Sequence, residues 1–327
     1  MQIIFRLLSY LPIGLIIVAL IGNISCLLIF RLNKNFRNIS SMVYLSFTAV
    51  FDTLSLFEWN LNLFLRPNFN LKLEYLNLFN CKFIIFIQFF SLQSSAILLS
   101  LMCIDRFMTI ISKPGSIFTR LPFSTNKSAY VWSILTLIFI FMLNSHILIF
   151  NGNFMQNSIE NVTKDEILNG IIVNDTKIEI FIRRKEKCFW YSPNFKFITI
   201  WNRVNLIVRN FIPFTLMLVF NTLLITMTLM SNKKGFINKS TIRKRRLTIS
   251  ILSITFAFIL MTMPSSILHA FFYEKFAKKY YGVILIRSLD FVSFSFNSTL
   301  FLNCFITNRK FRNYIRNIIS NMFLKKF

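Results

Sequence analysis

The 327-residue chain is 55% hydrophobic and only 15% charged. A soluble domain carries about 25% charged residues, so an ordinary soluble fold is excluded. The apolar residues form blocks of roughly 20 or more residues, which are typical of helices that span a bilayer. These blocks are too long and too uniformly apolar for the alternating strands of a membrane barrel. The composition therefore predicts an all-α membrane protein.

Lysine and arginine total 37 against 12 aspartates and glutamates, which gives a net charge of +25. On a soluble chain this excess would indicate nucleic acid. Here the charges fall between apolar blocks, so contact with a lipid bilayer explains them and no nucleic-acid partner is expected. The sequence contains no Ser/His/Asp set, no His-Glu-x-x-His and no Gly-rich phosphate loop, so we do not expect an enzyme.

Seven apolar segments are candidate spans, approximately 8–31, 41–65, 79–111, 128–151, 198–231, 247–272 and 281–306. They predict one seven-helix domain over residues 1–306, followed by a short amphipathic eighth helix and a basic tail over residues 307–327. The first segment lacks a basic start and a small-residue cleavage site, so we expect a span rather than a cleaved signal peptide.

Basic residues gather in the stretches that follow the first, third, fifth and seventh apolar segments. In a seven-span protein these four stretches lie on the same side of the membrane. Because basic loops are cytoplasmic, we expect the N-terminus outside the plasma membrane and the C-terminus inside. Segment 152–197 is then external and contains glycosylation sequons at Asn161 and Asn174. It also contains Cys188, and Cys81 begins the third span on the same side. A disulfide between these cysteines requires an oxidising exterior, where both fall.

Two polar motifs lie within the apolar spans. Asp52 falls near the middle of the second span, where an ionisable residue is costly and indicates function by default. The alternative is a carboxyl group neutralised by a neighbouring Asn or Ser. The third span ends in Asp105-Arg106-Phe107, about 25 residues after Cys81, which gives some 37 Å of helix, enough to cross a bilayer.

Over roughly residues 10–320, the polar residues resemble the motifs of rhodopsin-like G-protein-coupled receptors. Asp105-Arg106-Phe107 is similar to the family's Asp-Arg-Tyr, and Ala49-Val50-Phe51-Asp52 is similar to its Ala-x-x-Asp. Other residues at matching positions are Asn23, Ser95, Trp132, Pro213, Phe258, Pro264 and Asn297. The resemblance implies a receptor that couples an extracellular ligand to a heterotrimeric G protein.

The resemblance also implies roles for particular residues. Asp105 would hold Arg106 in the inactive state, and Arg106 would meet the G protein in the active one. Asp52 and Ser95 would bind a sodium ion, and the proline kink at Pro264 would be the hinge of activation.

Several positions depart from the family pattern. Thr262 stands where the family has tryptophan, and Asn221 stands where it commonly has tyrosine. Asn297-Ser298-Thr299-Leu300-Phe301 keeps the asparagine of Asn-Pro-x-x-Tyr but lacks its proline and tyrosine. A second register places Asn303 in the tyrosine position, and the sequence leaves both registers open. These departures indicate a divergent member.

Gln88 stands where amine receptors place an aspartate, which disfavours an amine ligand. The outer halves of the spans also offer Glu58, Arg209, His269, Arg287 and Asp290. Charges at these depths face a cavity or each other. Arg209 and Arg287 suit a carboxylate or an amidated peptide end. The alternative is internal pairing, for example of Arg287 with Asp290.

Ile212-Pro213-Phe214 and Arg243–Arg246 are similar to segments of invertebrate neuropeptide receptors of the FMRFamide type. We therefore expect a receptor for a peptide or another non-amine ligand. The alternatives are a chemosensory or orphan receptor with degenerate switching, and a membrane transporter, although no inverted repeat is visible.

Overall fold

Long apolar stretches of the sequence form long helices in a computed structural model, which describes residues 9–111, 123, 125–155, 185–192, 195–232 and 239–324. The helices are α2 (Leu11–Leu32), α3 (Lys34–Arg37), α4 (Ser40–Ser55), α5 (Phe57–Phe69), η1 (Leu73–Tyr75), α6 (Leu78–Ile111), α7 (Asn126–Phe150), α9 (Ile198–Asn205), η3 (Leu206–Phe211), α10 (Ile212–Asn232), α11 (Lys239–Ile267), η4 (Leu268–Phe272), α12 (Tyr273–Ala277), α13 (Tyr280–Phe296), α14 (Leu300–Thr307) and α15 (Arg309–Leu324). Segments η3 and η4 are π-helical.

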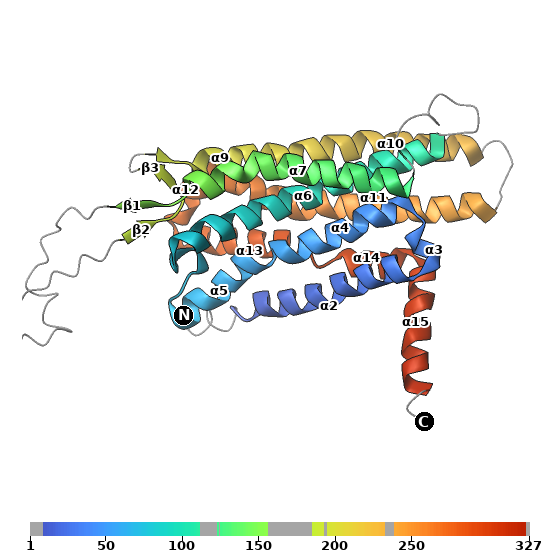
Figure 1. Ribbon diagram of the computed structural model, residues 1–327, viewed down its shortest axis with the longest axis horizontal. Helices are drawn as coiled ribbons and strands as arrows, with labels where there is room; N and C mark the ends of the chain where they lie inside the picture. Colours follow the sequence, from blue (N-terminus) through green and yellow to red (C-terminus); the bar gives the residue numbers. More distant parts are fainter. Residues whose placement is uncertain are drawn as a thin grey trace, which may run out of the picture.

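Six helical stretches of the described chain are long and apolar enough to cross a membrane, and the bent pair α13–α14 makes a seventh if it counts as one span. In Figure 1 these helices run side by side as one elongated bundle. The number, length and apolar character of these helices confirm the predicted all-α, multi-pass membrane protein. Helices suit a bilayer because each backbone polar group bonds within its own helix.

Helix α6 lies at the centre of the bundle. It packs against α4, α7 and α10, and 72% of its most apolar window is buried, against 28% for α7. The small side chains of Ser91, Ser95 and Ala96 are buried on α6, and small residues allow neighbouring helices to approach closely. Helix α7 instead exposes Phe139 and Met142, as expected of a surface that faces lipid.

The last predicted span, 281–306, is not one continuous helix. Helix α13 ends at Phe296, α14 begins at Leu300, and the two are bent by 51°. The hydroxyls of Ser298 and Thr299 donate to the carbonyls of Ser295 and Phe296, at 2.7 Å in both cases. Such local bonds compete with regular helical ones and explain a break without proline.

Two short antiparallel strand pairs lie at one end of the bundle, which we call the hairpin end (Figure 1). Strand β1 (Asn153–Met155) pairs antiparallel with β2 (Lys185–Lys187), and β3 (Trp190–Ser192) pairs with β4 (Phe195–Lys196).

At the opposite end, α15 projects away from the bundle at a steep angle (Figure 1). It is anchored by Phe311, which is fully buried against the rings of Phe30, Phe36 and Phe301.

Gly282, near the start of α13, has no room for a side chain. A Cβ atom there would lie 2.0 Å from the carbonyl oxygen of Phe276. We expect Gly282→Ala to lower the free energy of unfolding by about 1–3 kcal/mol, because backbone would have to shift. Gly14→Ala is the control, since a Cβ at Gly14 meets nothing within 4 Å. Thermal unfolding in detergent measures both, and equal melting temperatures would contradict the prediction.

Candidate functional site

Five buried polar residues from α2, α4, α6 and the α13–α14 bend form one group, which we call the Asp52 cluster: Asn23, Asp52, Ser55, Ser95 and Asn297. The Ser95 hydroxyl donates to Asp52 Oδ1 at 2.5 Å. Asn297 donates through Nδ2 to Ser55 Oγ at 2.6 Å, and Asn23 donates through Nδ2 to the Asn297 carbonyl at 3.1 Å. Ser55 in turn donates through Oγ to the Asp52 backbone carbonyl at 2.8 Å, so these bonds link four segments that are far apart in the sequence.

Two local features bring these segments together. The bend after Phe296 frees the Asn297 carbonyl from the regular helical pattern, so that it accepts from Asn23. One turn further on, a Cβ at Gly22 would lie 3.1 Å from the Cβ of Phe301, so α2 and α14 touch at this glycine. Close contact of this kind needs a small residue on one helix.

The Asp52 cluster contains two oxygen groups of the kind that bind hard cations such as sodium. Asp52 supplies a carboxylate and Ser95 a hydroxyl oxygen, and hard cations prefer oxygen ligands. Asp52 is only 2% exposed, and its charge needs a cation or hydrogen-bond donors at this depth.

The Asp105 motif lies at the other end of α6. The carboxylate of Asp105 accepts a 2.6 Å hydrogen bond from the hydroxyl of Ser40, the first residue of α4. Arg106 is buried with only 9% of its surface exposed. The ring of Phe107 lies 5.4 Å from that of Phe220 on α10. The motif thus connects α6 with both α4 and α10.

Helix α11 is joined to η3 and α10 by two side-chain pairs. Asn210 donates through Nδ2 to Thr262 Oγ1 at 2.9 Å, and Asn221 donates through Nδ2 to Thr255 Oγ1 at 2.9 Å. Thr262 and Asn221 stand where the resemblance predicts aromatic side chains, so polar contacts occupy both positions.

A second buried group lies towards the hairpin end of the bundle, between η3, α11, η4 and α13. Asp290 accepts from the Ser265 hydroxyl at 2.5 Å, and His269 Nε2 lies 2.8 and 3.0 Å from its two oxygens. Arg209, 6% exposed, donates to Ser293 Oγ at 3.4 Å. Both π-helical segments border this group, and π-turns occur often at functional sites.

The structure brings together three of the predicted ligand-pocket residues, Arg209, His269 and Asp290. The hydrogen-bond partners of Asp290 are Ser265 on α11 and His269 on η4. Arg287 is half-buried one turn before Asp290 on α13, and Gln88 is buried on α6 with no partner for its Oε1 atom among the described residues.

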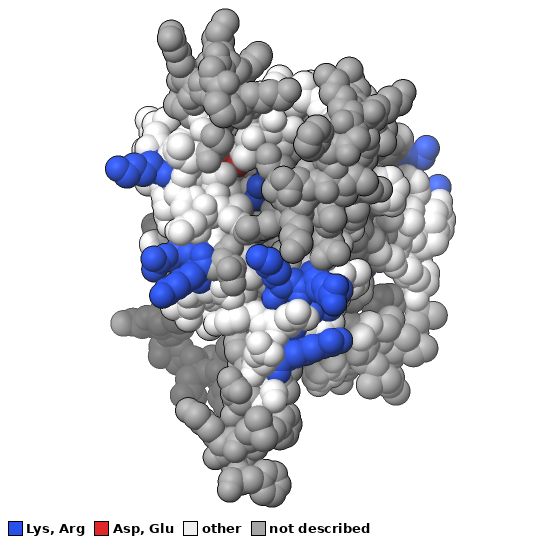
Figure 2. Space-filling view, turned by 90° about the vertical axis from the view of Figure 1, so that its right-hand side faces the viewer, with Lys and Arg blue, Asp and Glu red and all other residues white. Residues whose placement is uncertain are grey.

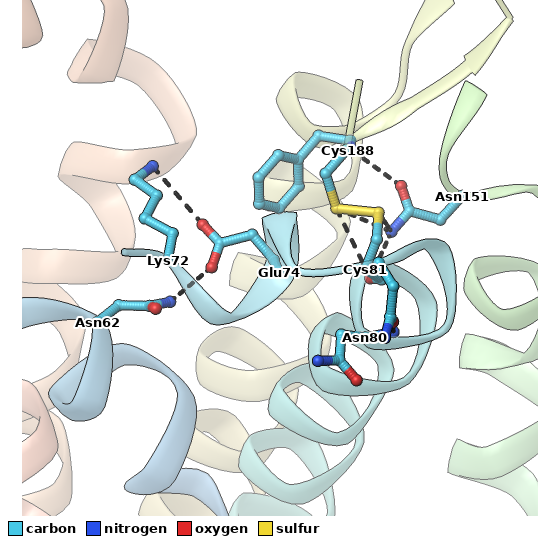
Figure 3. The surroundings of a disulfide bond; sticks show 9 residues. Asn62, Lys72, Glu74, Asn80, Cys81, Asn151 and Cys188 are labelled. Carbon is cyan, nitrogen blue, oxygen red and sulfur yellow. Dashed lines mark hydrogen bonds and ion pairs between the residues drawn. A yellow bond between two sulfur atoms is a disulfide. The ribbon is translucent and has the colours of Figure 1, made fainter. Parts of the chain in front are cut away.

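Glu58 belongs to a further polar group, together with Asn62 and Glu74. Asn62 Nδ2 donates to Glu58 Oε1 at 3.0 Å and to Glu74 Oε2 at 2.7 Å. Glu74 also forms an ion pair with Lys72 at 3.6 Å (Figure 3). These contacts fix η1 and the following loop on α5.

The predicted disulfide between Cys81 and Cys188 is confirmed, with a Cα–Cα distance of 5.7 Å (Figure 3). Asn151, at the end of α7, donates to the Cys81 carbonyl at 2.9 Å and accepts from the Phe189 backbone N–H at 2.9 Å. Tyr191 stacks on Phe197 nearby, and burial raises the pKa of Tyr191. The sequons at Asn161 and Asn174 lie outside the described residues.

The remaining predicted positions occupy helix contacts. Trp132 stacks on Phe123 at 5.4 Å, and Phe258 contacts Phe296 at 5.3 Å. Pro213 is buried just after η3, whereas Pro264 is exposed within α11, four residues before η4 begins. Cys26, Cys103 and Cys304 are buried free cysteines.

The bundle end that carries α3 and α15 shows several patches of lysine and arginine, with little acidic surface among the described residues (Figure 2). Its exposed basic residues include Lys34, Arg37, Lys127, Arg309, Lys310 and Arg316. Basic residues also lie on α12 and before α13, at Lys275, Lys278 and Lys279, so the excess is not confined to one end.

No protein-family model matches the chain, and no curated protein matches it. The function therefore has to be inferred from the chain's own residues.

Several residues of these groups were not expected from the sequence. Ser40, Asn62 and Asn210 each bond a residue on another element, and Asn144, Gln93 and Asn205 form a buried chain of amides across α7, α6 and α9, with bonds of 2.7 and 3.0 Å. The available signal was a polar residue inside an apolar span, but it does not reveal which partner that residue meets.

Ser95→Ala removes the only hydroxyl that bonds the Asp52 carboxylate among the described residues. We expect a loss of about 1–3 kcal/mol of unfolding free energy, since a buried acceptor loses its donor. Ser100→Ala is the matched control, because Ser100 is also buried on α6 but bonds its own helix at Ile97. Equal losses, measured by thermal unfolding, would show that the Ser95 bond is not special.

Proposed function

We propose that the chain is a rhodopsin-like G-protein-coupled receptor that transmits the binding of an external ligand, a peptide or other non-amine molecule, to a heterotrimeric G protein. The observation that carries this proposal is the Asp52 cluster. Asn23, Asp52, Ser95 and Asn297 were singled out by their resemblance to four separate family motifs, and they meet in one buried group. Their meeting supports the proposal because each residue was selected by its place in the family pattern, before any contact between them was considered.

The proposed topology counts α13 and α14 as one span, which gives seven. The disulfide end faces the oxidising exterior of the plasma membrane, and the end with α3 and α15 is cytoplasmic. Helix α15 is then the amphipathic eighth helix. It rests its exposed cations Arg309, Lys310 and Arg316 at the anionic headgroups.

Signalling in this proposal is a shift between two arrangements of the bundle. A ligand between the outer ends stabilises the arrangement that exposes Arg106 at the cytoplasmic end, and it does so only by binding that arrangement more tightly. The buried Arg209, His269 and Asp290 group lies in the outer half, where it can sense such a ligand. Gln88 in place of an aspartate supports a non-amine ligand.

The second candidate is a membrane transporter. It is favoured by the break between α13 and α14, since discontinuous helices often form substrate sites in transporters. Substrate flux into vesicles, measured beside ligand-evoked nucleotide exchange on a G protein, separates the two functions. A degenerate receptor, with the departures at Thr262, Ser298 and Phe301, would show neither strong exchange nor flux.

Arg106→Ala tests the proposed coupling residue. We expect ligand-evoked G-protein activation to be lost in a ligand screen with a promiscuous G protein, because the cation that meets the G protein is gone. Surface expression, followed by antibody labelling of intact cells, stays near the wild-type level. Undiminished activation in this variant would contradict the role of Arg106.

Asp52→Asn tests the proposed sodium site. We expect sodium chloride to raise the melting temperature of the purified wild-type protein relative to choline chloride at equal ionic strength, because a bound ion stabilises the folded state. The variant has no carboxylate charge for the ion, so the difference between the two salts disappears. A sodium-specific shift that persists in Asp52→Asn rules the site out.

A further inference from the structure

The contact between α11 and the η3–α10 segment contains two buried amide–hydroxyl pairs, Asn210–Thr262 and Asn221–Thr255. Thr262 is fully buried and Asn210 is 1% exposed, while Thr255 and Asn221 are 3% and 7% exposed. Both pairs are therefore shielded from lipid and from water. The amide nitrogen comes from the η3–α10 side in both, and the hydroxyl comes from α11.

Helical periodicity places both pairs along one line of contact. Asn210 and Asn221 are 221 − 210 = 11 residues apart, which is about three turns. Thr255 and Thr262 are 262 − 255 = 7 residues apart, which is about two turns. Each set therefore lies on one face of its helix, and the two faces meet. Because α10 and α11 run in opposite directions, Asn210 meets the later threonine.

The threonine hydroxyls are held in one orientation. Thr262 Oγ1 donates to the Phe258 carbonyl at 2.7 Å, and Thr255 Oγ1 donates to the Leu252 carbonyl at 3.1 Å. Each hydroxyl has thus given its proton to its own helix and can only accept from the asparagine. This fixes which amide atom faces the threonine.

The asparagine amides, by contrast, are half-satisfied. The Oδ1 atoms of Asn210 and Asn221 are buried and have no hydrogen-bond partner in the part of the chain that the structure describes. A buried carbonyl without a donor is unfavourable, and a partly satisfied polar network is less stable than a complete one. An arrangement that supplies a donor to these oxygens gains stability that the observed arrangement lacks.

We propose that Asn210, Thr262, Asn221 and Thr255 form a polar clamp that holds α11 against α10, and that breaking the two amide–hydroxyl bonds lets α11 move away from α10. The four residues are positioning residues, since they act through the placement of α11. The movement of α11 can be tested without any assumption about function. Only the effect of that movement on signalling rests on the proposed receptor function.

The test measures the distance between α10 and α11 by double electron–electron resonance in nanodiscs, with spin labels on Thr226→Cys and Thr248→Cys. Native Cys26, Cys103 and Cys304 are buried, and Cys81 is bonded to Cys188, so the labels attach to the introduced residues. Thr262→Val and Thr255→Val keep the side-chain shape and remove the acceptor. Each raises the ratio of long to short distances roughly fivefold, as expected for one hydrogen bond, and the double variant raises it about 25-fold if the two effects add.

Thr222→Val is the matched control, because Thr222 is an exposed threonine on α10 that bonds only its own helix, at the Leu218 carbonyl. It leaves the distance distribution unchanged. Thr262→Ser and Thr255→Ser retain the hydroxyl and keep the wild-type ratio. Unchanged distances in the double valine variant, or serine variants that open like the valine ones, overturn the clamp.

Asn210→Leu and Asn221→Leu give a second route if a valine variant fails to fold. Each removes the donor together with the open oxygen and raises the long-distance fraction in the same direction; no change in either overturns the clamp. Nucleotide exchange on a G protein is measured in parallel. Longer distances without greater nucleotide exchange support the clamp and contradict the receptor function. Failure of the clamp, which leaves the distances unchanged, is therefore distinguishable from failure of the receptor function.

Discussion

A polar group inside a bilayer has no water to bond, so it must find its partner within the protein. This constraint makes the polar residues of the spans the points at which helices are joined. Asp52 bonds Ser95 on another helix, Asp105 bonds Ser40, and Asp290 bonds Ser265 and His269. Every one of these carboxylates connects two helices. The apolar surface between them determines how closely the helices pack, but it does not select which helices are neighbours.

The same constraint accounts for what could be predicted from the sequence. The span positions follow from the length of apolar blocks, and the structure places helices within a few residues of them. The disulfide followed because Cys81 and Cys188 fall on one side of the expected topology. In both cases the prediction needed only the order of segments along the chain.

The contacts between helices were harder to predict, for a physical reason. In a span that is apolar on all sides, hydrophobic periodicity does not reveal which face is turned inward. The sequence did not indicate, for example, that Asp290 would meet Ser265 on α11 and His269 on η4. The break at Asn297 was also missed, since it comes from the hydroxyls of Ser298 and Thr299 and not from a proline.

The departures from the family pattern acquire a common meaning in the structure. Thr262 and Asn221 stand where large aromatic side chains are expected, and each forms a hydrogen bond between α11 and its neighbour. An aromatic contact is broad and tolerates sliding, whereas a hydrogen bond is lost within a fraction of an ångström. A bundle that holds α11 through two short polar contacts has few intermediate positions available to that helix. Replacement of aromatic contacts by polar ones therefore does not by itself imply a lost switch, and it is equally consistent with a switch that has two discrete positions.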